Sequence, residues 1–312
     1  MFGSPVRWMH LTGPALGAAL LVLATSPALA DGPPVFTTTY SQGLSGKLTI
    51  AGSSALQPLV DQAAKNFQAA NKNVQVTVSA GGSGAGRSGA CQGSLDIGMS
   101  DVSLTDQEIA SLNCSNAVQT AIAIEAFAVA ANPKGPGGLQ AMTKEQLQGI
   151  FSGQITNWSQ VGGDDQQVAL INRLKGSGTR QNMANYLFDG DDTQFAVGLS
   201  EEDNSQTVVN TVSQTPGAIS YLGLAFLNNP QLVTVGLQQP DGSMMMPTKD
   251  TVATGQWPIG GPGLAITRGQ GTELANSFIS YMLSPSFESD PVWDALGFVV
   301  PSNPSIGNPT GQ

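Results

Sequence analysis

Charged side chains are scarce in this sequence. Only 11% of its 312 residues are Asp, Glu, Lys or Arg, against about a quarter in an average soluble protein. A surface built instead from Ser, Thr, Gln and Asn is common in proteins outside the cytoplasm. The formal net charge of −10 also counts against nucleic acid or an anionic membrane as a partner, since both attract basic proteins.

Histidine is nearly absent, because His10 is the only one in the chain. It lies in an N-terminal segment that resembles a signal peptide: Arg7 and His10 give a basic start, an apolar stretch follows at 16–24, and an Ala-Leu-Ala cleavage pattern ends it at 28–30. The apolar stretch is too short and too interrupted for a comfortable membrane span, and no cysteine follows it directly for a lipid anchor. We expect residues 1–30 to be removed and the mature chain to be exported.

Removal of that segment leaves a chain without histidine, which narrows the functions open to it. Ser-His-Asp catalysis, Cys-His catalysis and His-ligated zinc are excluded, and the sequence shows no acidic cluster of the metal-ligand type. We predict no catalytic residue, no metal site and no cofactor. The two cysteines, Cys91 and Cys114, are expected to form a disulfide rather than to stay free thiols, and their spacing does not fit a C-x-x-C redox motif.

The mature chain alternates strand-like and helix-like segments, which predicts an α/β fold with largely parallel sheets. Residues 31–46 are rich in Gly, Pro, Ser and Thr and indicate a flexible leader, and residues 301–312 indicate a disordered tail. The clearest helix spans 56–67, with Ser54 as its expected N-cap. The apolar run 121–130 is typical of a buried central strand and is long enough to pass from one domain to another.

Three loops share one design, because each holds glycine and hydroxyl residues between a strand and a helix. They are 52–55 (Gly-Ser-Ser-Ala), 82–86 (Gly-Ser-Gly-Ala-Gly) and 176–179 (Gly-Ser-Gly-Thr). Backbone N–H groups at a helix N-terminus, with hydroxyls beside them, suit a compact oxyanion. Arg173 and Asp101 stand at equivalent strand ends, where ligands of open α/β sheets bind. Taken singly, the second loop could instead be a flexible glycine linker, and the third an ordinary strand-to-helix turn with a helix cap.

In their order along the chain, these loops resemble those of a known family, the phosphate-specific substrate-binding proteins of ABC transporters. The resemblance covers nearly the whole mature chain, from about Leu48 to Phe298. One glycine motif would be weak support, whereas six matching segments in the right order are specific. The matching segments are 51–59 (AGSSALQPL), 82–86 (GSGAG), 96–101 (DIGMSD), 146–153 with 155–158 (QLQGIFSG and ITNW), 176–180 (GSGTR) after Arg173, and 215–219 (TPGAI).

The resemblance implies a type II periplasmic-binding-protein fold, in which two α/β lobes with a ligand cleft between them close on a phosphate ion. Lobe I is expected to comprise 47–128 and 258–300 and lobe II 129–257, with chain crossings near Val129 and Trp257. The implied partner is the membrane permease of an ABC importer. The implied phosphate-binding residues are Ser53, Ser54, Ala55, Ser83, Asp101, Arg173, Ser177, Gly178 and Thr179.

Two charged residues bear on this interpretation. Asp101 looks unfavourable beside an anion, but a carboxylate can accept a hydrogen bond from protonated phosphate, whereas sulfate offers no proton; otherwise Asp101 is a helix cap or a surface charge. Lys175 departs from the family, because many members carry an acidic residue there that braces the arginine. This departure puts the orientation of Arg173 in question, unless Lys175 is a solvated lysine with no role.

The sequence therefore predicts an exported, monomeric protein that binds inorganic phosphate with high affinity and is not an enzyme. One alternative is an exported phosphomonoesterase on the same scaffold, although the mature chain offers it neither histidine nor a metal-ligand cluster. Another is an adhesion or pilus-associated relative in which phosphate binding is vestigial, with Lys175 as the only hint.

Overall fold

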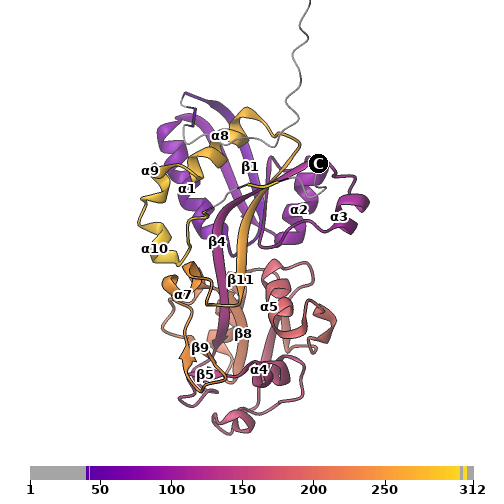
Figure 1. Cartoon of the computed structure of the whole chain (residues 1–312), viewed down its shortest axis with the longest axis vertical. Coiled ribbons are helices and arrows are strands. Elements are labelled where there is room, and N and C mark those ends of the chain that lie inside the picture. Colours follow the sequence, from indigo (N-terminus) through magenta and orange to yellow (C-terminus); the bar gives the residue numbers. More distant parts are fainter. Residues whose placement is uncertain (1–39, 42, 303–304, 308–312) are drawn as a thin grey trace, which may run out of the picture. The chain divides into compact units, whose positions relative to one another are not determined.

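The computed structural model describes residues 40–41, 43–302 and 305–307 (Figure 1). The predicted signal peptide lies outside the described residues. Within the described ranges, no helix is both long and apolar enough to cross a membrane. The strands are β1 (Ser45–Gly52), β2 (Asn73–Ala80), β3 (Ile97–Ser100), β4 (Ala117–Ala131), β5 (Ala141–Met142), β6 (Ala169–Arg173), β7 (Ser200–Glu202), β8 (Ala218–Gly223), β9 (Val233–Gln238), β10 (Met244–Met245), β11 (Gly260–Arg268) and β12 (Ser305–Gly307).

Helices alternate with these strands along the chain. Short 3-10 helices lie at Trp158–Val161, Asp192–Gln194 and Leu224–Phe226. The α-helices are α1 (Gln57–Ala70), α2 (Ser83–Gln92), α3 (Asp106–Ser111), α4 (Lys144–Phe151), α5 (Gly178–Phe188), α6 (Ser205–Gln214), α7 (Lys249–Ala253), α8 (Glu273–Met282), α9 (Pro285–Glu288) and α10 (Val292–Leu296).

Parallel strands build the first half of the sheet. β1 pairs in parallel with β2 on one side and with β3 on the other, and α1 and α2 connect them. α1 forms because five apolar residues recur at helical spacing and bury one face. It begins at Gln57, and Ser54 does not cap it as predicted. α1 has no side-chain cap among the described residues, and the Oγ of Ser53 instead accepts hydrogen bonds from the N–H groups of Ala55 (3.1 Å) and Leu56 (3.2 Å), which precede the helix.

β4 joins the two halves of the sheet. Its residues up to Ala126 pair with β11, whereas those from Phe127 onward pair with β8 and β9. β11 is antiparallel to β3 and β4, and β8 and β9 are antiparallel to β4. The sheet is therefore mixed, and not largely parallel as predicted, because its two long strands run against their neighbours (Figure 1). β4 exchanges partners between Ala126 and Phe127, and the lobe boundary near Val129 stays a prediction.

The segment that leads back into the first half of the sheet is hydrogen-bonded to β4 at the point where β4 exchanges partners. Trp257 lies just before β11, and its indole N–H donates a hydrogen bond to the carbonyl oxygen of Phe127 at 2.8 Å. The N–H of Phe127 in turn donates to the carbonyl oxygen of Ile259 at 2.9 Å. Two segments far apart in the sequence are therefore hydrogen-bonded to each other where β4 exchanges partners.

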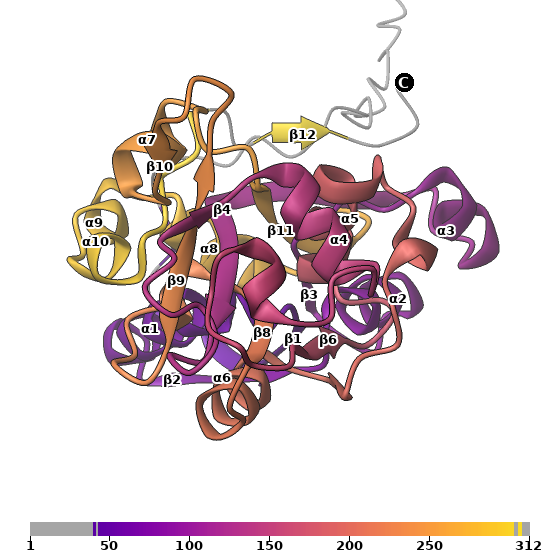
Figure 2. The ribbon, with the colours of Figure 1, turned by 90° about the horizontal axis from the view of Figure 1, so that it is seen from below.

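The second half of the sheet repeats the parallel arrangement. β6 pairs in parallel with β8 on one side and with β7 on the other, and α5 follows β6. α4 and α5 lie side by side (Figure 2), and the short strands β5 and β10 both pair with β9. The first and third glycine loops therefore follow strands that lie in different halves of the sheet.

Each half has its own hydrophobic core. In the first, Phe67 of α1 contacts Phe278 of α8 edge to face, with ring centroids 5.4 Å apart. In the second, Phe151 of α4 contacts Phe195 in the same way at 6.0 Å. Trp158 is buried in this second core, where its indole N–H donates to a backbone carbonyl oxygen. Separate cores are what a chain of two lobes requires.

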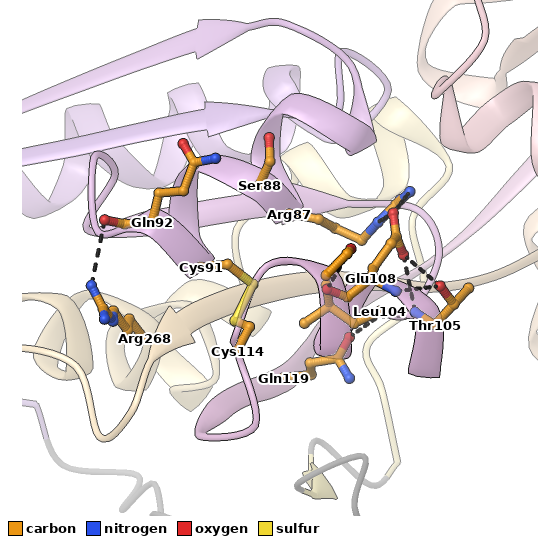
Figure 3. The surroundings of a disulfide bond; sticks show 12 residues. Arg87, Ser88, Cys91, Gln92, Leu104, Thr105, Glu108, Cys114, Gln119 and Arg268 are labelled. Carbon is orange, nitrogen blue, oxygen red and sulfur yellow. Dashed lines mark hydrogen bonds and ion pairs between the residues drawn. A yellow bond between two sulfur atoms is a disulfide. The ribbon is translucent and has the colours of Figure 1, made fainter.

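Cys91 at the end of α2 and Cys114 after α3 form a disulfide (Figure 3), which confirms the prediction. The two cysteines are 23 positions apart in the sequence. Arg87 of α2 and Glu108 of α3 also form an ion pair, with 2.7 Å between nitrogen and oxygen. α3 is therefore attached to α2 by one covalent and one ionic link.

Parts of the predicted leader and tail belong to the fold. β1 begins inside the predicted leader 31–46, and Tyr40 packs edge to face on Tyr281 with ring centroids 5.0 Å apart. Within the predicted tail 301–312, Ser305–Gly307 forms β12 and pairs with β4. Parts of both segments therefore pair or pack with the rest of the fold, although their composition favours turns. The other residues of the predicted leader and tail lie mostly outside the described ranges.

Candidate functional site

The three loops of glycine and hydroxyl residues meet in space. The N–H of Gly82 donates to the carbonyl oxygen of Gly52 at 2.9 Å, which joins the second loop to the first. The N–H of Gly84 donates to the carbonyl oxygen of Gly176, also at 2.9 Å, which joins the second loop to the third. The loops from both halves of the sheet therefore form one cluster, which we call the loop cluster (residues 52–55, 82–86 and 176–179).

Helix N-termini point donors at the loop cluster. α2 begins at Ser83 and α5 at Gly178, both inside the loops, and α1 begins just after the first loop. Ser177 caps α5, since its Oγ accepts a hydrogen bond from the N–H of Arg180 at 3.3 Å. A helix N-terminus carries unpaired N–H groups and the positive end of the helix dipole. The cluster is therefore locally rich in donors although the chain is acidic.

Asp101 follows β3 and lies inside the loop cluster, only 3% exposed. Its backbone N–H donates to Ser83 Oγ (3.0 Å), and its Oδ2 accepts a hydrogen bond from Thr179 Oγ1 (3.1 Å). The side-chain amide of Asn182 donates to its carbonyl oxygen at 3.0 Å. A Cβ on Gly178 would lie 2.7 Å from the Asp101 Cβ, so only glycine allows this approach. Oδ1 has no hydrogen-bond partner among the described residues.

The ionisation of Asp101 is set by opposing effects. Burial raises the pKa of Asp101, because a carboxylate loses its hydration in the protein interior. Side-chain hydrogen bonds, among them those with Ser53 and Thr179, and the positive charge of Arg173 lower the pKa, because they favour the ionised form. Asp101 is therefore a buried carboxyl group surrounded by donors.

Arg173 ends β6 and is 1% exposed. Its Nε donates to the carbonyl oxygen of Glu202 and its Nη2 to that of Asp203, both at 3.3 Å. Nη2 also donates to Ser54 Oγ at 3.3 Å, whereas Nη1 has no partner in the described part of the chain. Burial lowers the pKa of Arg173, but a guanidinium remains protonated. Arg173 thus brings to the loop cluster a buried cation with one donor, Nη1, that no described residue accepts.

The structure answers the question that Lys175 raises. Lys175 is exposed, and the guanidinium of Arg173 is held by the backbone carbonyl groups of Glu202 and Asp203. An acidic side chain at position 175 is therefore not needed to orient Arg173. The sequence could not reveal these acceptors, because every residue has a carbonyl group.

Ser54 belongs to a contact that the sequence did not predict. Its Oγ accepts a hydrogen bond from the N–H of Ser205 at 3.0 Å and lies 3.0 Å from Ser205 Oγ. Ser205 is the first residue of α6, so a further helix N-terminus reaches the loop cluster. The hydroxyl of Ser54 is shared between α6 and Arg173, which links the first loop to the second half of the sheet.

All nine residues that the sequence singled out are buried in or beside the loop cluster. Three neighbours were missed: Asn182, Ser205 and Glu125. Asn182 and Ser205 gave no signal, because polar residues at such positions are common. Glu125 did give one, since it is the only charged residue in the apolar run 121–130; it lies on β4, and its carboxyl group interacts with Asp101.

The chemistry of the loop cluster suits an oxyanion and not a metal. Within the described ranges, no group of three or more His, Cys, Asp or Glu residues could hold a metal ion. One guanidinium, several hydroxyls and helix N-termini can bind a compact anion, and a carboxyl group can take a proton from it. A cavity of about 650 Å³ lies beside the cluster and is lined by Ser177, Arg87 and Glu108, among others.

Comparisons with known proteins agree with this arrangement. The model of the PBP superfamily domain matches residues 37–286. The phosphate-binding protein PstS of Bacillus subtilis is 38% identical to this chain over 250 residues, which cover 80% of this chain and 79% of that protein.

Two solved structures share the fold. One is a candidate phosphate ABC transporter substrate-binding protein with bound phosphate from Clostridium perfringens, with a TM-score of 0.73 and 24% identity, covering 82% of this chain and 100% of that one. The other is an ABC-type phosphate transport receptor from Vibrio cholerae, with a TM-score of 0.61 and 24% identity, covering 81% of this chain and 100% of that one. Sequence match and fold together lead to one conclusion: the chain belongs to the PBP superfamily, in the family of PstS-type substrate-binding proteins with the two-lobe type II fold.

Proposed function

We propose that this protein binds inorganic phosphate outside the cytoplasm and delivers it to the membrane permease of an ABC importer. The observation that carries the proposal is a pair of buried polar atoms without partners among the described residues, Nη1 of Arg173 and Oδ1 of Asp101. Leaving a buried donor or acceptor unsatisfied costs about 1–3 kcal/mol. Protonated phosphate satisfies both atoms, because it offers an anionic oxygen to the arginine and an O–H to the aspartate.

The proposed contacts come from both halves of the sheet. Hydroxyl groups, backbone N–H groups and one guanidinium would together replace the hydration shell of the ion. Helix N-termini contribute roughly 0.3–2 kcal/mol each, depending on burial. We assign the phosphate contacts to Ser53, Ser54, Ala55, Ser83, Asp101, Arg173, Ser177, Gly178 and Thr179.

Asp101 gives the site its selectivity in this proposal. An ionised carboxylate accepts the hydrogen bond that a phosphate proton donates, whereas a sulfate oxygen in the same place would face a buried negative charge. A site built to hydrogen-bond a group that a competitor lacks rejects the competitor by on the order of 10⁴–10⁵. Phosphate is therefore favoured although the two ions have similar size and shape.

The wider assignment extends this binding role to the whole chain. The relatives' names, a phosphate-binding protein in Bacillus subtilis and a phosphate transport receptor in Vibrio cholerae, support phosphate as the ligand. We assign the mature chain to exported, monomeric binding proteins and not to enzymes, since it lacks histidine once residues 1–30 are removed. The proposed lobes are 47–128 with 258–300, and 129–257.

Titration calorimetry on the chain from Asp31 onward, dialysed free of phosphate, tests the proposal. We expect saturable binding of phosphate with one site per chain and no heat of binding with sulfate. Equal affinity for both anions would contradict the role of Asp101. Failure to bind phosphate at micromolar concentration would favour the adhesion alternative, and turnover of a chromogenic phosphate ester would favour a phosphomonoesterase.

A further inference from the structure

Glu125 is a buried acid in β4 that the proposed phosphate contacts do not explain. Its side chain is 2% exposed, and neither carboxyl oxygen has a hydrogen-bond partner of ordinary geometry among the described residues. An isolated ionised carboxylate in such a place is strongly disfavoured, and the group takes up a proton instead. A neutral carboxylic acid is a hydrogen-bond donor, so the question is which acceptor it faces.

The pairing of the strands brings Glu125 to the face that carries Asp101. Glu125 stands opposite Gly261 of β11, and β11 lies between β4 and β3. Cross-strand partners point to the same face of a sheet, and Gly261 has no side chain to occupy it. A Cβ on Gly261 would point at Asn182 Oδ1, 3.8 Å away, and the amide of Asn182 donates to the carbonyl oxygen of Asp101.

The two carboxyl groups act on each other directly. Burial raises the pKa of Glu125 well above its ordinary value, and the negative charge of Asp101 raises it further. The neighbouring Glu125 in turn lowers the pKa of Asp101, and the positive charge of Arg173 lowers it as well. β11 presents only glycine and proline opposite this part of β4, and the gap beside Glu125 is lined by apolar residues such as Ala55 and Phe298.

If Asp101 is the acceptor in the proposed phosphate site, on which this inference rests, Glu125 completes it. We propose that Glu125 is a neutral acid that donates a hydrogen bond to Oδ1 of Asp101, so that the two carboxyl groups together hold one proton and one negative charge. Each carboxylate oxygen has two lone pairs, so Oδ1 can accept from Glu125 and from phosphate at once. Glu125 is thus a positioning residue that acts on the ligand through Asp101.

The pair sets selectivity in a way that Asp101 alone does not. Without the donor at Oδ1, Asp101 would hold its own proton more readily, because burial favours the neutral form. A neutral Asp101 donates a hydrogen bond, and sulfate can accept it. Ionisation of Glu125 would place a second negative charge beside the anion. Selectivity therefore depends on a single proton shared by two acids.

The pH dependence of unfolding, measured without phosphate, tests the neutral state of Glu125. The fold retains a proton that the unfolded chain loses above about pH 4.3, so the folded state binds more protons and its stability falls as pH rises. The fall continues until the raised pKa of Glu125 is passed. We expect the unfolding equilibrium constant of the wild type to rise relative to that of Glu125→Gln by up to about tenfold per pH unit.

Glu273→Gln is the matched control, because Glu273 is exposed in the first turn of α8. This variant is expected to follow the wild-type curve. If the unfolding equilibrium constants of the wild type and Glu125→Gln depend on pH in the same way, Glu125 is not a neutral acid in the folded state.

Binding measurements test the link to the ligand. Gln keeps a donor toward Asp101 and cannot ionise, so Glu125→Gln is expected to bind phosphate within about threefold of the wild type near neutral pH. Glu125→Ala removes one of the two donors to Oδ1, and we expect about 10- to 100-fold weaker phosphate binding, together with measurable sulfate binding. The ratio of the wild-type affinity to that of Glu125→Gln is expected to fall as pH rises, a comparison in which the ionisation of phosphate itself cancels.

The outcomes separate this inference from the proposed function. If the wild type binds no phosphate, the proposed function fails, while the unfolding curves still decide whether Glu125 is a neutral acid. If the wild type binds phosphate but Glu125→Gln binds it as weakly as a folded Glu125→Ala does, the proposed hydrogen bond from Glu125 to Asp101 does not exist. Wild-type affinity and selectivity in Glu125→Ala would also overturn it.

Discussion

Asp101 and Arg173 reach the same loop cluster from opposite halves of the sheet, one after β3 and the other at the end of β6. The guanidinium is held mainly within its own half, by the carbonyl oxygens of Glu202 and Asp203. The carboxylate depends on the other half, because its Oδ2 accepts from Thr179 Oγ1. The guanidinium is therefore oriented mainly by its own half of the sheet, while the carboxyl group also takes a hydrogen bond from the other half.

This difference separates two tasks of an anion site. A buried cation attracts any small oxyanion, so in the proposed phosphate site the half that carries Arg173 would supply affinity. A buried carboxyl group repels most small anions, so the half that carries Asp101 would supply selectivity. The four variants below change one side at a time.

Replacing Asp101 with Asn should have the largest effect, because it removes the buried charge that opposes sulfate. We expect the ratio of phosphate affinity to sulfate affinity to fall by on the order of 10⁴. Calorimetric titration with both anions measures it. Asp106→Asn in α3, which is exposed, is the control, and undiminished rejection of sulfate by Asp101→Asn would contradict the role of Asp101.

Replacing Arg173 with Ala should weaken the binding of phosphate and leave the order of preference unchanged. Truncating one partner of a buried charge pair costs about 2–5 kcal/mol. Arg268→Ala, at the exposed end of β11, is the control for losing a positive charge. A loss below about 1 kcal/mol in phosphate titrations would show that Arg173 does not contact the ligand.

Replacing both Cys91 and Cys114 with Ser tests the half that carries Asp101 for stability rather than binding. Closing a loop with a sequence separation of 23 stabilises the fold by about 3 kcal/mol in the chain-entropy model. Urea unfolding, with the reduced wild type alongside, measures the loss. Phosphate affinity should change by less than about threefold, and a larger loss of affinity at full folding would mean that α3 supports the site.

Replacing Thr179 with Val should have the smallest effect of the four. It removes the hydroxyl that donates to Asp101 from the other half of the sheet, and a lost hydrogen bond to a charged group costs about 1.5–3 kcal/mol, less where water replaces it. We expect phosphate binding to weaken by about 1–2 kcal/mol. Thr179→Ser keeps the hydroxyl and should bind like the wild type; equal losses in both variants would point to the methyl group instead.

The three loops could be found from the sequence because their chemistry is local. Glycine and hydroxyl residues between a strand and a helix predict helix N-termini, and the structure forms them at Ser83 and Gly178. The N-cap of α1 was predicted wrongly, because the helix begins at Gln57 without a side-chain cap from the described residues. The disulfide was predicted from two cysteines in a chain that we expect to be exported.

What the sequence could not supply depends on contacts between distant segments. Arg173 is held by backbone carbonyl groups, which every residue has, so no residue type in the sequence marks them. For this reason the lysine at position 175 suggests, from the sequence alone, that Arg173 lacks a partner to orient it. The antiparallel course of β11 beside β3 and β4 depends on long-range pairing, which local patterns do not encode. Glu125 could be noticed as a single charge in an apolar run. Its proximity to Asp101 could not, because it depends on β11 lying between β4 and β3.

The hydrogen bond from Trp257 to Phe127 gives this protein an optical reporter without any label. Trp158 lies in the second core and Trp293 in the first, and their indole N–H groups donate to the carbonyl oxygens of Gly217 and Phe287. The indole of Trp257 is instead bonded where β4 passes from one half of the sheet to the other. A rotation of the lobes would disturb only this indole among the three. A phosphate-dependent change in tryptophan emission that disappears in Trp257→Phe would therefore record the movement of the lobes in solution.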